Sequence, residues 1–119
     1  MICCGCSEVL AIGYRRYDMI AEYGDNDENI VIIHDKLDFG QCYLALGIPM
    51  GGEFTNVNSL EELKAMKCWT KETPLRVVTG YTNIAKRWFT EQGFEHVELS
   101  TADGALEASP AMGLSDIIL

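Results

Sequence analysis

Short apolar runs separated by polar stretches dominate the pattern of this chain. Residues 30–33 and 75–79 are rich in β-branched side chains, which is typical of strands buried on both faces. Residues 41–48 and 96–99 predict two further strands, and residues 116–119 predict the beginning of another.

A capping box predicts the start of a short helix between the strands expected at residues 41–48 and 75–79. Ser59 can accept a hydrogen bond from the backbone three residues on, and Glu62 can reach back to the backbone of Ser59. Leu60, Leu63 and Met66 then share one face of that helix, which we expect to be buried.

A second helix is predicted directly after the strand at residues 75–79. Thr82 is the expected N-cap, and Gly93 is the expected end. Residues 104–112 predict a short third helix that is bent or ended near Pro110. The apolar face of the second helix carries Ile84, Ala85, Trp88 and Phe89.

Alternation of strands with helices predicts an α/β layered domain with a mostly parallel sheet flanked by helices. The chain has 119 residues, which fits one domain. Residues 1–16 show no sustained hydrophobic period, and the pattern becomes orderly from Tyr17 onward. We therefore expect a divergent N-terminal segment at residues 1–16 and the folded region at residues 17–119.

Acidic residues outnumber basic ones, and the formal net charge is −9. This balance argues against general nucleic-acid binding, which requires basic surface to neutralise phosphates, and against adhesion to anionic membranes. A small anionic substrate remains compatible, because backbone N–H groups at a helix N-terminus can hold a phosphate. No apolar run approaches the roughly 20 residues that span a bilayer. No targeting segment is visible in the first residues.

The five cysteines indicate reduced thiols rather than a disulfide framework, because their number is odd and their spacing irregular. Cys3, Cys4 and Cys6 resemble one half of a metal clip, but no second pair of Cys or His ligands follows. An unstructured cysteine-rich start is the simpler interpretation.

The turn after residues 75–79 is the first candidate binding site. Ligands of open α/β sheets bind beyond the carboxyl ends of the strands, where Thr79, Gly80 and Tyr81 are expected. The alternative is an ordinary connection between a strand and a helix.

Residues 100–110 are the second candidate site, because small and hydroxyl residues precede a helix that carries Glu107. Small residues such as Gly104 let a ligand approach the backbone, and a carboxylate can hold a ribose hydroxyl or Mg²⁺. The alternative is a surface helix with a solvated glutamate. Asp116 is a further acidic candidate near the start of a strand. A role as a cap or turn residue is expected there equally with a role in the site. Walker A, dinucleotide-binding, nucleophile-elbow and zinc-protease motifs are absent from the sequence.

Residues 107–118 resemble the signature of the ATP phosphoribosyltransferase family. That signature has Glu, five residues, Gly, one residue, a small residue, two residues and then Ile or Val, which Glu107, Gly113, Ser115 and Ile118 match. Three other stretches also resemble the family, so that the resemblance covers residues 17–119. They are residues 37–44 with Pro49, residues 75–79 followed by Tyr81, Asn83 and Phe89, and residues 100–107.

The resemblance implies a glycosyltransferase that joins ATP to 5-phosphoribosyl 1-diphosphate with Mg²⁺, in the first step of histidine biosynthesis. It implies a site between two lobes of a periplasmic-binding-protein-like (type II) fold and an oligomer of identical subunits in the intact family member. This chain would be mainly the second lobe, truncated at both ends and impaired or inactive alone. A chloroplast location is implied for a plant protein and a cytoplasmic one otherwise.

The resemblance also carries residue roles over to this sequence. Glu107 would be the catalytic residue that binds the ribose or its metal ion, and Gly104 would admit the substrate closely. The other expected substrate-binding residues are Thr79, Tyr81, Ala105 and Asp116. The alternative function is a non-catalytic fragment that binds a nucleotide or pairs with another subunit.

Overall fold

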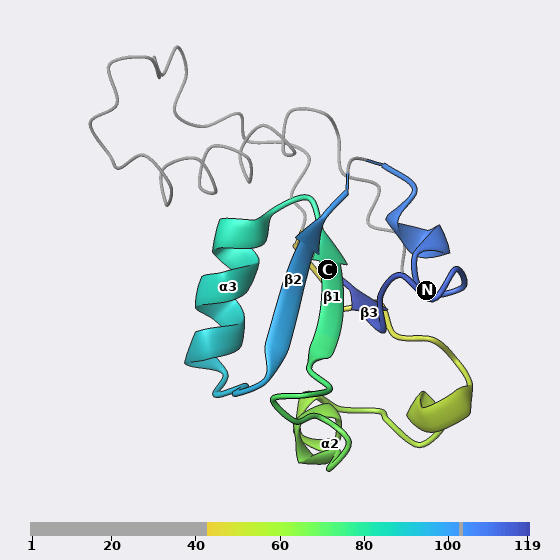
Figure 1. Cartoon of the computed structure of the whole chain (residues 1–119), viewed down its shortest axis with the longest axis vertical. Coiled ribbons are helices and arrows are strands. Elements are labelled where there is room, and N and C mark those ends of the chain that lie inside the picture. The colour runs from red at the N-terminus through yellow and green to blue at the C-terminus, as the bar shows by residue number, and fades with distance from the viewer. Residues whose placement is uncertain (1–42, 103) are drawn as a thin grey trace.

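A three-stranded parallel sheet forms the centre of the computed structural model, which describes residues 43–102 and 104–119 (Figure 1). The strands are β1 (Leu75–Thr79), β2 (Val97–Thr101) and β3 (Ile117–Ile118), in the spatial order β2-β1-β3. Val77 in the central strand pairs with Leu99 of β2 on one side and with Ile117 of β3 on the other. The predicted α/β class with a mostly parallel sheet is confirmed.

In the described residues, two α-helices and two 3-10 turns accompany this sheet. Helix α2 (Leu60–Ala65) lies near the start of β1, and α3 (Thr82–Glu91) packs alongside β2 (Figure 1). The 3-10 turns are η1 (Gly52–Phe54) and η2 (Leu106–Ala108). The described residues contain no helix that is long and apolar enough to cross a membrane.

The capping box of α2 forms as the sequence predicts. The Ser59 hydroxyl accepts from the Glu62 N–H at 3.2 Å, and the Glu62 carboxylate accepts from the Ser59 N–H at 3.1 Å. These bonds satisfy backbone donors that have no partner inside the helix. The end of α3 at Gly93 is also confirmed, because this glycine takes a φ of 75° that disfavours other residues.

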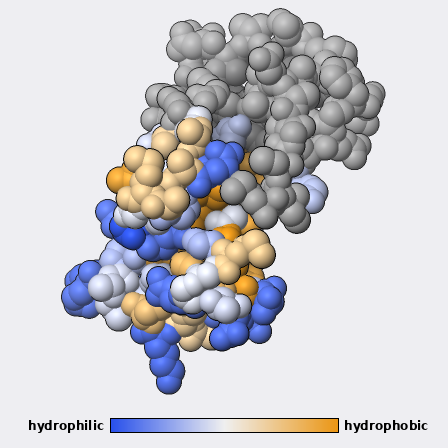
Figure 2. Space-filling view, turned by 90° about the vertical axis from the view of Figure 1, so that its right-hand side faces the viewer, coloured by the Kyte–Doolittle hydropathy of each residue, from blue (hydrophilic) through white to orange (hydrophobic). Residues whose placement is uncertain are grey.

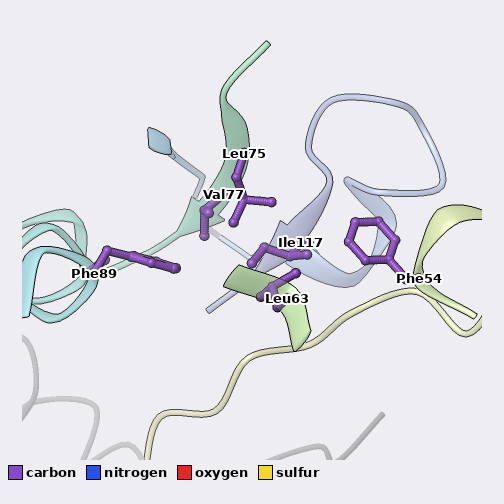
Figure 3. Close-up of a cluster of buried hydrophobic side chains, with 7 residues drawn as sticks. Phe54, Leu63, Leu75, Val77, Phe89 and Ile117 are labelled. Carbon is purple, nitrogen blue, oxygen red and sulfur yellow. The ribbon is translucent and has the colours of Figure 1, made fainter. Parts of the chain in front are cut away.

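Within residues 43–102 and 104–119, one apolar cluster holds the helices to the sheet. The side chains of Leu63, Leu75, Val77 and Ile117 converge beneath the sheet, with Phe89 and Phe54 on opposite sides of them (Figure 3). Burying a side chain of this size stabilises the fold by about 1.5–3 kcal/mol relative to leaving it exposed. Because Ile117 is fully buried, the short strand β3 is part of the core.

Three local predictions are wrong in the described residues. Residues 43–48 form no strand, and Gly47 alone makes an isolated antiparallel bridge with Ile118. Thr82 is the first helical residue of α3 rather than its N-cap, which is Tyr81 without a side-chain hydrogen bond. The helix expected at 104–112 is only the 3-10 turn η2 followed by turns, because Pro110 cannot continue an α-helical ladder. The strand expected at residues 30–33 lies outside the described residues.

The molecular surface mixes polar and apolar residues. On the face shown in Figure 2, hydrophilic side chains alternate with apolar ones over the described residues and do not gather into one block. Four large apolar side chains of the described residues are nevertheless exposed: Tyr43, Met50, Met112 and Leu114.

Candidate functional site

The carboxyl ends of all three strands lie along one edge of the sheet, because the strands are parallel. At the end of β1, Thr79 is fully buried, and its hydroxyl accepts from the Tyr81 N–H at 3.0 Å. This bond folds the chain sharply from β1 into α3 and leaves Tyr81 half-buried. Thr79 therefore shapes the turn from inside, and any direct contact with a ligand here falls to Gly80 and Tyr81.

The chain leaving β2 turns through two residues in the left-handed region. Gly104 has a φ of 73° and Ala105 a φ of 50°. A residue with a Cβ atom rarely adopts a left-handed conformation, so Ala105 carries about 1–2 kcal/mol of backbone strain. These two residues lead into η2, where the side chain of Glu107 is exposed to solvent.

A cavity of about 340 Å³ lies beside Glu107. Residues 47–50 form one wall, Glu107, Pro110 and Ala111 form another, and Ile118 at the end of β3 contributes as well. Glu107 is the only ionisable residue that lines this cavity in the described part of the chain. The arrangement offers one carboxylate at the mouth of an apolar hollow, at the edge where ligands of parallel sheets bind.

Gly47, which lines this cavity, approaches Ile118 unusually closely. The Gly47 N–H donates to the Ile118 carbonyl at 2.9 Å, and the Ile118 N–H donates back at 3.0 Å. A Cβ atom on residue 47 would lie 2.7 Å from the Ile118 Cγ1 atom, which is closer than real contacts allow. Only glycine fits this bridge without displacing Ile118.

Asp116 lies at the other end of the strands, beside the second residue of β1. Its carboxylate accepts from the Arg76 guanidinium at 2.6 Å and 3.2 Å, and from the Arg76 backbone N–H at 2.8 Å. Hydrogen bonding to Asp116, together with the charge of that carboxylate, raises the pKa of Arg76. The structure therefore engages Asp116 with Arg76, and the role of Asp116 in substrate binding stays a prediction.

No group of three or more His, Cys, Asp or Glu residues in the described part of the chain could hold a metal ion. A metal at this edge of the sheet would consequently depend on Glu107 and on oxygen atoms supplied by a ligand.

The family profile described as HisG: ATP phosphoribosyltransferase matches residues 7–119. The chain belongs to the ATP phosphoribosyltransferase family. The relationship predicted from residues 107–118 is thereby confirmed. The predicted boundary at residues 16 and 17 stays a prediction.

Members of the ATP phosphoribosyltransferase family from plants and archaea are similar to this chain over most of its length. ATP phosphoribosyltransferase 1, chloroplastic, of Arabidopsis thaliana is 48% identical over 110 residues, which is 92% of this chain and 27% of the relative. ATP phosphoribosyltransferase 2, chloroplastic, of the same plant gives the same values. The ATP phosphoribosyltransferase of Sulfolobus acidocaldarius is 30% identical over 108 residues, covering 91% of this chain and 32% of the relative. The chain thus spans about a quarter of the length of the plant relatives.

The structure brings some of the residues predicted for an ATP phosphoribosyltransferase site together and separates others. Gly104 and Ala105 lead directly to Glu107 and its cavity. Thr79 and Tyr81 lie at the end of the neighbouring strand and do not line that cavity. Ser115, the small residue of the signature, is 3% exposed, which explains why a small side chain is needed there.

Sequence reasoning missed Gly47 and Arg76. Arg76 had a signal that could have been used, because it is the only charged residue in the strand Leu75–Thr79 and an arginine in such a place requires a partner. Gly47 had none, since its close contact comes from a residue far along the chain.

Proposed function

We propose that this chain supplies part of the active site of an ATP phosphoribosyltransferase. The reaction joins ATP to 5-phosphoribosyl 1-diphosphate and gives N1-(5-phosphoribosyl)-ATP and diphosphate, the first step of histidine biosynthesis. The single observation that carries this proposal is the position of the family signature. It places Glu107 on an apolar cavity at the carboxyl edge of the parallel sheet.

Glu107 is the residue that we assign to the reacting sugar. The bond from the ribose carbon to diphosphate breaks with its electron pair leaving on diphosphate, and the N1 lone pair of the adenine forms the new bond. The ribose carbon becomes positively charged on the way. A carboxylate that accepts hydrogen bonds from the ribose hydroxyls orients the sugar and favours that charge, more strongly when apolar walls exclude water.

The small residues before Glu107 serve close approach of the substrate. Gly104 and Ala105 are exposed in front of η2, and their small side chains leave the backbone there accessible. Tyr81 would form the neighbouring cleft wall with the turn that Thr79 stabilises. Asp116 would act through the fold, since its carboxylate is bound by Arg76.

Mg²⁺ fits this site as a partner of the substrate rather than as a resident ion. Mg²⁺ is commonly held by one or two carboxylates together with substrate phosphates, and Glu107 is an exposed carboxylate with no hydrogen bond to the described residues. When bound, the ion would neutralise charge on the departing diphosphate.

Location and assembly follow from the relatives by the same proposal. A chloroplast location is proposed because both Arabidopsis relatives are named as chloroplastic. We also propose that the family member works as an oligomer of identical subunits. A net charge of −9 is consistent with small-molecule substrates and not with nucleic acid.

A second function deserves a direct test, because the chain spans about a quarter of its plant relatives. The cavity beside Glu107 can bind ATP or 5-phosphoribosyl 1-diphosphate without turnover if catalysis requires further residues. This alternative is a non-catalytic nucleotide-binding or subunit-interaction module.

One experiment separates these outcomes. The purified chain is incubated with ATP, 5-phosphoribosyl 1-diphosphate and Mg²⁺, and product is measured by chromatography and mass spectrometry. Glu107→Gln is compared with Glu95→Gln, an exposed carboxylate distant from the cavity lining. A fall in turnover of about 10²–10³-fold in Glu107→Gln, with no such fall in Glu95→Gln, supports the transferase.

Calorimetry completes the test. Binding of either substrate without turnover, weakened in Glu107→Gln and unchanged in Glu95→Gln, supports the binding module. Absence of both binding and turnover, or equal behaviour of the two variants, refutes the assignment of Glu107.

A further inference from the structure

Arg76 directs all of its side-chain hydrogen bonds to the segment that follows Glu107. Its Nε and Nη2 atoms donate to the two Asp116 oxygens at 3.2 Å and 2.6 Å, and its Nη1 atom donates to the Gly113 carbonyl at 2.8 Å. The backbones are joined as well, because the Asp116 N–H donates to the Arg76 carbonyl at 2.9 Å. An arginine fork held at both carboxylate oxygens fixes direction as well as distance.

The segment from residue 105 to residue 114, here termed the Glu107 turn, is bonded to itself. The Gly113 N–H donates to the Pro110 carbonyl at 3.1 Å, and the Leu114 N–H donates to the Ser109 carbonyl at 3.0 Å. The Ala108 N–H donates to the Ala105 carbonyl at 3.1 Å. A displacement at Gly113 is therefore passed back through the turn toward Glu107.

Hydrophobic packing does not fix the Glu107 turn to the sheet. The apolar core and the partly buried residues packed against it include no residue between 102 and 116. Asp116 is shielded, with a side chain 13% exposed, whereas the Arg76 side chain is 43% exposed. Within the described residues, the bonds from Arg76 are the main side-chain attachment of this turn to β1.

We infer that Arg76 is a positioning residue for Glu107. By holding Gly113 and Asp116 against β1, it sets where the Glu107 turn presents its carboxylate at the cavity. Arg76 touches no substrate in this scheme and acts from the opposite end of the strands. The inference rests on the proposed function only where it assigns Glu107 a role in ligand binding.

Amide hydrogen exchange tests the structural half without any ligand. In Arg76→Gln, exchange at Ala108, Ser109, Met112, Gly113 and Leu114 should accelerate about tenfold or more, because hydrogen bonds to charged groups are among the stronger ones. Amides of α3 should change far less. Arg76→Lys keeps the charge without the fork and should give an intermediate effect. Arg87→Gln is the matched control, since its ion pair with Glu91 is exposed and long at 3.8 Å.

Calorimetry with 5-phosphoribosyl 1-diphosphate and Mg²⁺ tests the functional half. Arg76→Gln should weaken binding severalfold, and this effect should vanish when Glu107 is already Gln, because both changes act through one carboxylate. A merely structural arginine would weaken binding equally in both backgrounds.

Each outcome decides one claim. Unchanged exchange in the Glu107 turn, or an equal rise across the whole chain in both Arg76→Gln and Arg76→Lys, overturns the positioning role. Selective loosening of the turn without any ligand binding by the unmodified chain keeps the attachment and refutes the proposed function instead. Additive effects on binding refute the coupling of Arg76 to Glu107.

Discussion

Replacing Gly47 with alanine adds one methyl group at the point where two chain segments come closest. The added Cβ atom would lie 2.7 Å from Ile118 Cγ1 and 3.0 Å from Ile118 Cδ1. The first of these atoms is not the flexible tip of its side chain, so relief requires rotation of Ile118 or separation of the two backbones. Separation would lengthen the hydrogen bonds at 2.9 Å and 3.0 Å that join residues 47 and 118.

The size of the effect follows from two opposing contributions. Replacing glycine by alanine stabilises by about 0.4–1 kcal/mol where the backbone permits it, because the unfolded chain loses freedom. Overpacking in a tight site costs about 1–3 kcal/mol. Gly51 provides the matched control, since its φ of −157° suits alanine and no atom lies within 4 Å of an added Cβ. The two variants should therefore differ by about 1–3 kcal/mol in the free energy of unfolding.

Urea denaturation of both variants measures that difference. The double variant Gly47→Ala with Ile118→Ala gives a further check, because shortening residue 118 removes both clashing atoms. The double variant should lose less stability than the sum of the losses in the two single variants. Gly47→Ala should also weaken substrate binding, since residues 47 and 118 both line the cavity. Equal stability of Gly47→Ala and Gly51→Ala would refute the steric reasoning.

Three other expectations concern stability and reactivity. Ser59→Ala should cost about 1 kcal/mol in urea denaturation through loss of the α2 cap, and a cost near zero would show that the Glu62 half of the box suffices. Ile117→Ala should cost about 2–5 kcal/mol, whereas Leu114→Ala, at a side chain 63% exposed, should stay within about 0.5 kcal/mol. Desolvation, reinforced by Glu53, raises the pKa of Cys68, so less thiolate is present near pH 8 in the folded chain than in the unfolded one. Iodoacetamide should then modify the Cys68 peptide more slowly without urea than with it, with the gap closing as pH rises; equal rates near pH 8 would contradict this.

Elements set by neighbouring residues could be predicted from the sequence. The cap at Ser59 and the helix end at Gly93 depend on a few adjacent positions, and the structure confirms both. The strand at Leu75–Thr79 carries its own β-branched pattern. Residues 43–48 also look like a strand, but a ladder requires a partner, and only Gly47 finds one in Ile118. The predicted N-cap at Thr82 was one residue too late, because a residue type that favours capping does not by itself decide where the helix begins.

The candidate site likewise combines residues that the sequence predicts with residues that it does not. Glu107 could be found because the spacing of its signature lies within one short stretch. The opposite cavity wall at residues 47–50 comes from a distant part of the chain, and no local pattern marks it. The partnership of Arg76 and Asp116 spans 40 positions, so that neither residue alone reveals whether an acid near a strand contacts a ligand or another side chain.

The spatial order β2-β1-β3 has a consequence for how the polypeptide acquires its shape. Strand β1 can meet α3 and β2 as soon as the next stretch of chain exists, whereas β3 joins from 40 positions away. Closing the longer loop costs only a little more entropy, roughly 0.6 kcal/mol per doubling of length, but it comes later in time. Until Ile117 is available, β1 lacks the partner that β3 supplies, and an unpaired strand edge of this kind is prone to pairing with other chains.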